Sequence, residues 1–198
     1  NIPCLLSSSN NPSRKTPYTV EAISLDPIEH PQKRWVGINQ NAANRYVEHF
    51  IFTNQLPLMI SNGTTLKREQ SLGNSKLDFW VDNTYIEVKT PLLNLQLPIG
   101  NHIKTKKVSE FNSFERFVKH INALADSLQE NEKAILLNCF IYDNKHFIPS
   151  RNNKCSNFVG EQVTNCIKKG VEMWQINFQI TPTEVSLLDY FSITEDFI

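Results

Sequence analysis

The fold of this chain is decided by residues 67–89, which read KREQSLGNSKLDFWVDNTYIEVK. Short alternating runs rich in β-branched or aromatic residues flank Gly73-Asn74 and Asp82-Asn83. Both dipeptides are typical of two-residue β-hairpin turns, so the stretch predicts three antiparallel strands in a fixed register. The apolar side chains expected on the core face of these strands are Leu77, Phe79, Ile86 and Val88.

Three acidic residues, Glu69, Asp78 and Glu87, recur every nine positions in this stretch. The register puts Glu69 opposite Asp78, and Asp78 opposite Glu87, about 5 Å apart at Cβ. Such a row of like charges is destabilising unless something compensates it. A hard cation such as Mg²⁺ or Mn²⁺ takes carboxylate oxygens as ligands, so we expect Asp78 and Glu87 to hold one. The alternative is a solvated sheet face, on which acids and lysines also alternate.

Two lysines accompany the acids. Lys89 follows Glu87 by two residues and is expected on the same face, where its ammonium can steer a water or a phosphate oxygen. Lys76 is expected opposite Lys89 and adds a second positive charge. A metal that polarises a phosphate, together with cations that offset developing charge, is what phosphodiester cleavage requires.

Composition narrows the class of protein. The chain has 198 residues, with 20 basic and 20 acidic side chains, so a nucleic-acid partner would be held by a local basic patch. The sequence carries no apolar run of transmembrane length and no secretory signal layout. The four cysteines lack metal-binding or disulfide-framework spacing, which predicts free, mostly buried thiols and a cytoplasmic location. The first residue is Asn, which suggests that an N-terminal segment is absent.

The chain divides into a β-rich segment at 1–34 and a main domain at 35–198. Short strands are expected at 2–6 and 18–25, and a helix is expected from Asn41 to about Thr53 with one apolar face. Glu48 lies beside that apolar face and could reach the acidic row. An ordinary surface glutamate is the alternative.

The second half alternates helices and strands. A strong helix is predicted from Ser109 to Leu128, a buried strand at 134–142, a helix ending at Gly170 and a strand at 171–180. This order predicts a mixed β-sheet flanked by helices in an α/β domain. The basic side chains expected to contact nucleic acid are Lys76, Lys104, Lys106, Lys107, Arg116, Lys119 and His120.

Four blocks of the sequence resemble a known family. They are NPSRKTPYTVE at 11–21, WVGINQNAANRYVE at 35–48, GNSKLDF at 73–79 and YIEVK at 85–89. In order and spacing they are similar to motifs of the sugar fermentation stimulation protein family. The element order and the Asp78, Glu87, Lys89 set resemble the restriction-endonuclease-like PD-(D/E)XK nucleases.

The resemblance implies an N-terminal OB-fold domain, a nuclease-like C-terminal domain, and DNA binding with little sequence preference. It implies metal-ligand or catalytic roles for Asp78, Glu87 and Lys89, and also for Glu69 and Glu48. Most of the OB-fold domain is missing from this sequence, so residues 1–34 are interpreted as its remnant. A second family block is poorly kept, and only Arg116, Lys119 and His120 match it.

Two functions follow from the sequence. The first is a Mg²⁺- or Mn²⁺-dependent phosphodiesterase acting on DNA or RNA, with DNA preferred. The second is a non-cleaving, sequence-nonspecific DNA-binding regulator of sugar metabolism. No membrane partner is expected, and the sequence leaves the oligomeric state open, with a homodimer among the alternatives.

Overall fold

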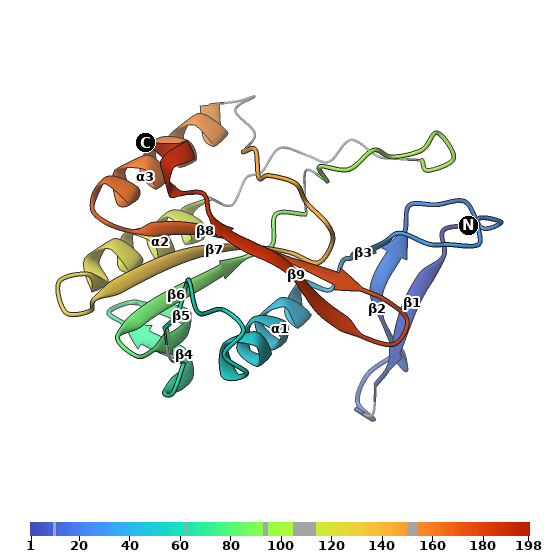
Figure 1. Cartoon of the computed structure of the whole chain (residues 1–198), viewed down its shortest axis with the longest axis horizontal. Helices are drawn as coiled ribbons and strands as arrows, with labels where there is room; N and C mark the ends of the chain where they lie inside the picture. Colours follow the sequence, from blue (N-terminus) through green and yellow to red (C-terminus); the bar gives the residue numbers. More distant parts are fainter. Residues whose placement is uncertain (10, 62, 93–94, 105–113, 150–153) are drawn as a thin grey trace.

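The computed structural model describes residues 1–198 except 10, 62, 93–94, 105–113 and 150–153. The described residues form two β-sheets with helices on both faces of the larger one (Figure 1). Among them, no helix is both long enough and apolar enough to cross a bilayer. The predicted α/β class with a mixed, helix-flanked sheet is confirmed.

The small sheet consists of β1 (Cys4–Ser8), β2 (Tyr18–Ser24) and β3 (Trp35–Gly37), all antiparallel. The first two strands lie close to the predicted ranges. The third starts at Trp35, on the main-domain side of the predicted boundary between residues 34 and 35, although it pairs with β2 of the small sheet. The boundary between domains stays a prediction. The Gly37 N–H donates to the Ile141 carbonyl at 2.8 Å and so joins the small sheet to the end of the large one.

The large sheet has six strands in sequence order. Its β4–β5, β5–β6 and β8–β9 pairs are antiparallel, whereas β6–β7 and β7–β8 are parallel because a helix connects each of these pairs. The strands are β4 (Leu66–Leu72), β5 (Ser75–Val81), β6 (Thr84–Lys89), β7 (Lys133–Phe140), β8 (Glu172–Ile180) and β9 (Val185–Ser192).

Each face of the large sheet has its own hydrophobic cluster. Helix α1 (Gln40–Phe52) packs on one face through Val47, Phe50 and Ile51. Helices α2 (Glu115–Ser127) and α3 (Lys154–Lys168) cover the other face, where Ile121 and Leu124 are buried (Figure 1). The sheet is therefore enclosed between two layers, and its central strands are buried on both sides.

Three details differ from the sequence predictions. Helix α1 starts one residue before Asn41, and Asn39 stands at its N-cap without a side-chain cap bond. Residues 109–113 of the predicted long helix lie outside the described residues, and α2 begins at Glu115. The segment after Pro182 forms β9, an edge strand that the sequence did not reveal because Leu187 and Leu188 are adjacent and break strict alternation. A short 3₁₀ helix, Thr194–Phe197, follows β9.

Candidate metal centre

Both hairpins have the predicted register. Across the first turn Gln70 pairs with Leu77 and Arg68 with Phe79, and across the second Phe79 pairs with Ile86. The ladders nevertheless omit every acid of the predicted row. The first skips Glu69 and Asp78, and the second ends at Phe79 and Ile86, one residue before Asp78 and Glu87.

Strand β5 separates from β6 at Asp78. The carboxylate of Asp78 fills the place of the missing ladder bonds: Oδ2 accepts from the Val88 N–H at 2.8 Å, and Oδ1 accepts from Asn44 Nδ2 on α1 at 2.8 Å. The alternation of side chains is broken at this point. Leu77 therefore packs with the α2 and α3 cluster, whereas Phe79 packs with the α1 cluster, and the predicted common core face for these two residues is wrong.

Glu87 lies in the middle of the site and is only 2% exposed. Its Oε1 atom accepts from Lys89 Nζ and from His120 Nδ1 of α2, the latter at 2.5 Å. Its Oε2 atom is also buried and has no hydrogen-bond partner among the described residues. A buried carboxylate oxygen without a partner is costly, and such an atom calls for an explanation such as a bound ion.

Asp78 and Glu87 influence each other electrostatically. Burial raises the pKa of Asp78, and the charge of nearby Glu87 raises it further. The hydrogen bonds from Val88 and Asn44 and the charge of Lys89 lower the pKa and oppose this effect. Two carboxylates that are near enough to interact electrostatically offer the kind of oxygen donor that a hard divalent cation takes.

The other two predicted acids each form an ion pair with a basic side chain. Glu69 binds Lys76 at 2.6 Å, and both side chains are more than half exposed. Glu48 is 3.5 Å from Arg68 of the edge strand and lines a groove of about 500 Å³ beside α1. Within the described part of the chain, no three His, Cys, Asp or Glu side chains are grouped as metal ligands, so the three-acid row is not formed.

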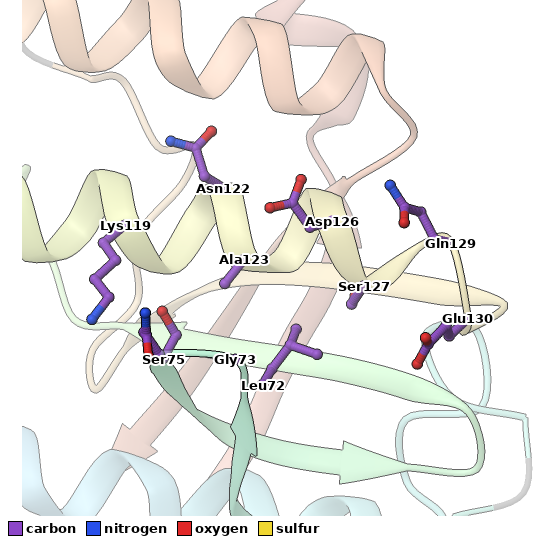
Figure 2. A pocket seen from close by; sticks show the side chains of 11 residues that line it. Leu72, Gly73, Ser75, Lys119, Asn122, Ala123, Asp126, Ser127, Gln129 and Glu130 are labelled. Atoms are coloured by element: carbon purple, nitrogen blue, oxygen red, sulfur yellow. The ribbon is translucent and has the colours of Figure 1, made fainter.

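The predicted nucleic-acid contacts are scattered. Lys104 and Arg116 are exposed, and Lys106 and Lys107 lie outside the described residues. Lys119 extends from α2 toward the β4–β5 turn and lines a groove of about 510 Å³ with Ser75 (Figure 2). His120 is buried against Glu87 rather than exposed to a partner. Contact with nucleic acid stays a prediction for all of these side chains.

Sequence reasoning missed Asn44. This residue lies one helical turn before Glu48, on the same side of α1, and it supplies the contact to Asp78 that was expected from Glu48. Its place in the block at 35–48 was the available signal. The sequence favoured the acid because a carboxylate suggests metal chemistry, whereas an amide does not.

The family follows from comparison with known proteins. A profile described as "Sugar fermentation stimulation protein RE domain" matches residues 41–184, which include Asn44, Asp78, Glu87, Lys89 and His120. The chain belongs to the sugar fermentation stimulation protein family. Its restriction-endonuclease-like domain is the one that carries Asp78 and Glu87, so the resemblance seen in the sequence is confirmed.

The relatives of this chain in the family are longer than it is. A sugar fermentation stimulation protein homolog of Microcystis aeruginosa is 30% identical over 194 residues, covering 94% of this chain and 74% of the relative. One of Pseudoalteromonas atlantica is 33% identical over 141 residues, covering 68% of this chain and 54% of the relative. A solved structure, Pyrococcus furiosus SfsA in complex with Ca²⁺, has the same fold, with a TM-score of 0.68 and 17% identity over 94% of this chain and 75% of that one.

Proposed function

We propose that this protein is a divalent-metal-dependent phosphodiesterase that acts on DNA, with Mg²⁺ or Mn²⁺ as its cofactor. The observation that carries the proposal is the buried Oε2 atom of Glu87, close to Asp78, for which the described residues provide no hydrogen-bond partner. Membership in a family with a restriction-endonuclease-like domain supports it. The Ca²⁺ complex of the Pyrococcus furiosus relative supports a divalent cation in this fold.

Asp78 and Glu87 are the residues that would hold the metal. Both offer carboxylate oxygens. Burial raises the pKa of Asp78 and repulsion from Glu87 raises it further, and a cation between the two carboxylates would offset that repulsion. When bound, the ion supplies Lewis-acid polarisation of a phosphate oxygen and a more acidic water. Asn44 and Val88 fix the rotamer of Asp78 through their hydrogen bonds, so this ligand is in place before any metal binds.

Lys89 is the residue placed to act on the substrate. Its ammonium touches Glu87 Oε1, lies 5.8 Å from the centre of the Phe117 ring, and belongs to a side chain that is 29% exposed. It can therefore reach a phosphate oxygen or orient the attacking water while it stays beside the carboxylate. In the hydrolysis, the water oxygen bonds to phosphorus, the ester P–O bond breaks, and the departing oxygen ends protonated.

Substrate binding would come from exposed cations on the surface of the domain. Four exposed side chains could approach a phosphate backbone: Lys76, Lys104, Arg116 and Lys119. Lys76 would have to release its ion-pair partner Glu69 to do so. Because the chain has no net charge, this binding depends on the local distribution of cations. Weak, salt-sensitive and sequence-independent binding is expected.

A second candidate function is binding without cleavage, in a DNA-binding regulator of sugar metabolism. Two observations favour it. Lys89 is engaged by Glu87, and only two of the four candidate acids meet at the site. The family's name, which refers to sugar fermentation, is consistent with a regulatory role.

Metal binding and cleavage assays together separate the two functions. Mg²⁺ and Mn²⁺ are titrated by calorimetry into the wild type, Asp78→Asn, Glu87→Gln and, as a control, Glu161→Gln on the exposed side of α3. The same proteins are then incubated with single-stranded DNA, double-stranded DNA and RNA. A nuclease predicts saturable binding and metal-dependent cleavage, both lost in the two site variants only.

Other results would decide against the proposal. A protein that binds metal and DNA but does not cleave the DNA would favour the regulator. Absence of metal binding in the wild type would refute the metal site itself. Cleavage that persists in both site variants would place the chemistry elsewhere in the molecule.

A further inference from the structure

The two oxygens of Glu87 have opposite surroundings. Oε1 accepts hydrogen bonds from two donors, Lys89 Nζ and His120 Nδ1. Oε2 accepts none from the described residues, although it is just as buried. The two oxygens of the carboxylate are therefore not equivalent. Oε1 is bound by protein donors, whereas Oε2 is available to a cation.

The His120 donor is the more buried of the two. His120 is 7% exposed and lies on α2, next to Ile121, which is 1% exposed in the core beneath that helix. Because a carboxylate oxygen only accepts, the His120 Nδ1 atom in contact with it must carry the proton. Lys89 differs, since its side chain is partly exposed and is the one we expect to turn toward substrate.

We infer that His120 is a positioning residue that restricts Glu87 to binding a divalent cation through Oε2 alone. This inference rests on the proposed metal site and concerns which ion that site selects. Glu87 Oε1 already accepts two hydrogen bonds, which use both of its lone pairs, so a metal is left with Oε2. Each Asp78 oxygen accepts only one of these bonds and keeps a lone pair for a cation. Mg²⁺ accepts this arrangement because it is octahedral and keeps several waters, and Mn²⁺ suits the same oxygen ligands.

Ca²⁺ responds differently to the same restriction. It takes six to eight oxygens and often uses both oxygens of one carboxylate. The His120 hydrogen bond would deny it the second oxygen of Glu87, so the site should discriminate against Ca²⁺ relative to Mn²⁺. Removal of the Nδ1 donor should weaken Mn²⁺ binding and at the same time relax this discrimination.

Three variants test the inference. His120→Leu removes the donor but keeps the apolar bulk, and His120→Met is a second donor-free variant that fills a core flexibly. His120→Asn keeps an N–H donor near the place of Nδ1. Mn²⁺, Mg²⁺ and Ca²⁺ are titrated by calorimetry into each full-length variant, and thermal unfolding without metal identifies the variants that fold.

The donor-free variants are expected to lose about 10- to 100-fold in Mn²⁺ affinity, the usual effect of removing a hydrogen-bond partner of a metal ligand. The Mn²⁺-to-Ca²⁺ affinity ratio should fall with it, by about tenfold, and His120→Asn should restore both quantities to within about threefold of wild type. A role in packing alone would leave the ratio unchanged.

The inference is overturned if a folded donor-free variant keeps the wild-type ratio, or if His120→Asn behaves like His120→Leu. Failure of the proposed function would give a different result. The wild type itself would then show no metal binding that depends on Asp78. A wild type that binds Mn²⁺ through Asp78, with an unchanged ratio in His120→Leu, would refute only the role of His120.

Discussion

The Asp78 carboxylate accepts a hydrogen bond from the backbone N–H of Val88 at 2.8 Å, across the place where β5 and β6 no longer pair. A side chain thus substitutes for a ladder bond between two strands. The substitution satisfies the Val88 donor, which a simple separation of the strands would have left unpaired. It also brings the Asp78 carboxylate so close to Glu87 that the charge of Glu87 adds to the effect of burial and raises the pKa of Asp78 further.

The first prediction concerns the pH dependence of stability. Because burial and then Glu87 raise the pKa of Asp78 above its ordinary value of 3.8, the folded protein binds a proton at this site more tightly than the unfolded chain. The stabilisation that results is complete below pH 3.8 and is lost as the pH rises through the folded pKa. Asp78→Asn does not titrate at this position. In metal-free buffer the free energy of unfolding of the wild type should therefore fall relative to that of Asp78→Asn as the pH rises above 3.8.

Urea unfolding at a series of pH values measures this difference. With Mn²⁺ present, the wild type should be stabilised by ligand binding and the variant should not. If the free energy of unfolding of the wild type instead rises relative to that of Asp78→Asn with increasing pH in metal-free buffer, the expected direction of the effect is contradicted.

The second prediction concerns Asn44. Its Nδ2 donates to Asp78 Oδ1 at 2.8 Å, so Asn44→Ala removes a hydrogen bond to a carboxylate and should cost about 1 kcal/mol in the free energy of unfolding. Metal affinity should fall about tenfold because Asp78 loses one of the two groups that orient it. Calorimetry and urea unfolding measure the two effects.

Gln40 provides the matched control on the same helix. It is exposed, lies one turn earlier in α1, and donates to the Thr90 carbonyl at 3.3 Å. Gln40→Ala should leave metal affinity at the wild-type level. Equal losses in Gln40→Ala and Asn44→Ala would show that α1 acts through its stability rather than through the contact with Asp78.

The third prediction concerns the backbone at Glu69. This residue has φ of +52°, in the left-handed region that side chains other than Gly, Asn and Asp rarely adopt. Glu69→Gly and Glu69→Ala both remove the exposed ion pair with Lys76, so their difference isolates the backbone. The glycine variant should be more stable than the alanine variant by about 1 kcal/mol in urea unfolding. Equal stabilities would show that the left-handed conformation costs nothing at this position.

The fourth prediction concerns the junction between the two sheets. A Cβ at Gly37 would lie 2.2 Å from Ile141 Cγ2 and 2.4 Å from Ile141 Cβ, and Ile141 is only 4% exposed. Gly37→Ala should therefore lower the free energy of unfolding by about 1–3 kcal/mol, as overpacking of a core does. Gly160→Ala is the control, because a Cβ there meets no atom within 4 Å. Similar midpoints for wild type and Gly37→Ala would contradict the predicted clash.

The sequence by itself determined the local elements around the site. Asp82 and Asn83 have φ of +42° and +65°, as their two-residue turn requires, and Gly73 has φ of +54° in the other turn. Because turn geometry fixes the register of a hairpin, the pairs nearest both turns follow from the sequence. The apolar periodicity of α1 and α2 likewise predicted which faces are buried.

Only the tertiary structure decided where the acids lie. Extrapolation from a turn assumes an unbroken ladder, but Glu69 adopts a left-handed conformation and the backbone of Asp78 does not pair with β6. The Asp78 carboxylate instead accepts hydrogen bonds from Asn44 and from the backbone N–H of Val88. These contacts come from α1 and from a neighbouring strand, 34 and 10 residues away along the chain. Glu87 likewise meets His120 from 33 residues away. Turn chemistry is local and can be read from sequence, whereas the partner of a buried carboxylate is set by the packing of distant elements.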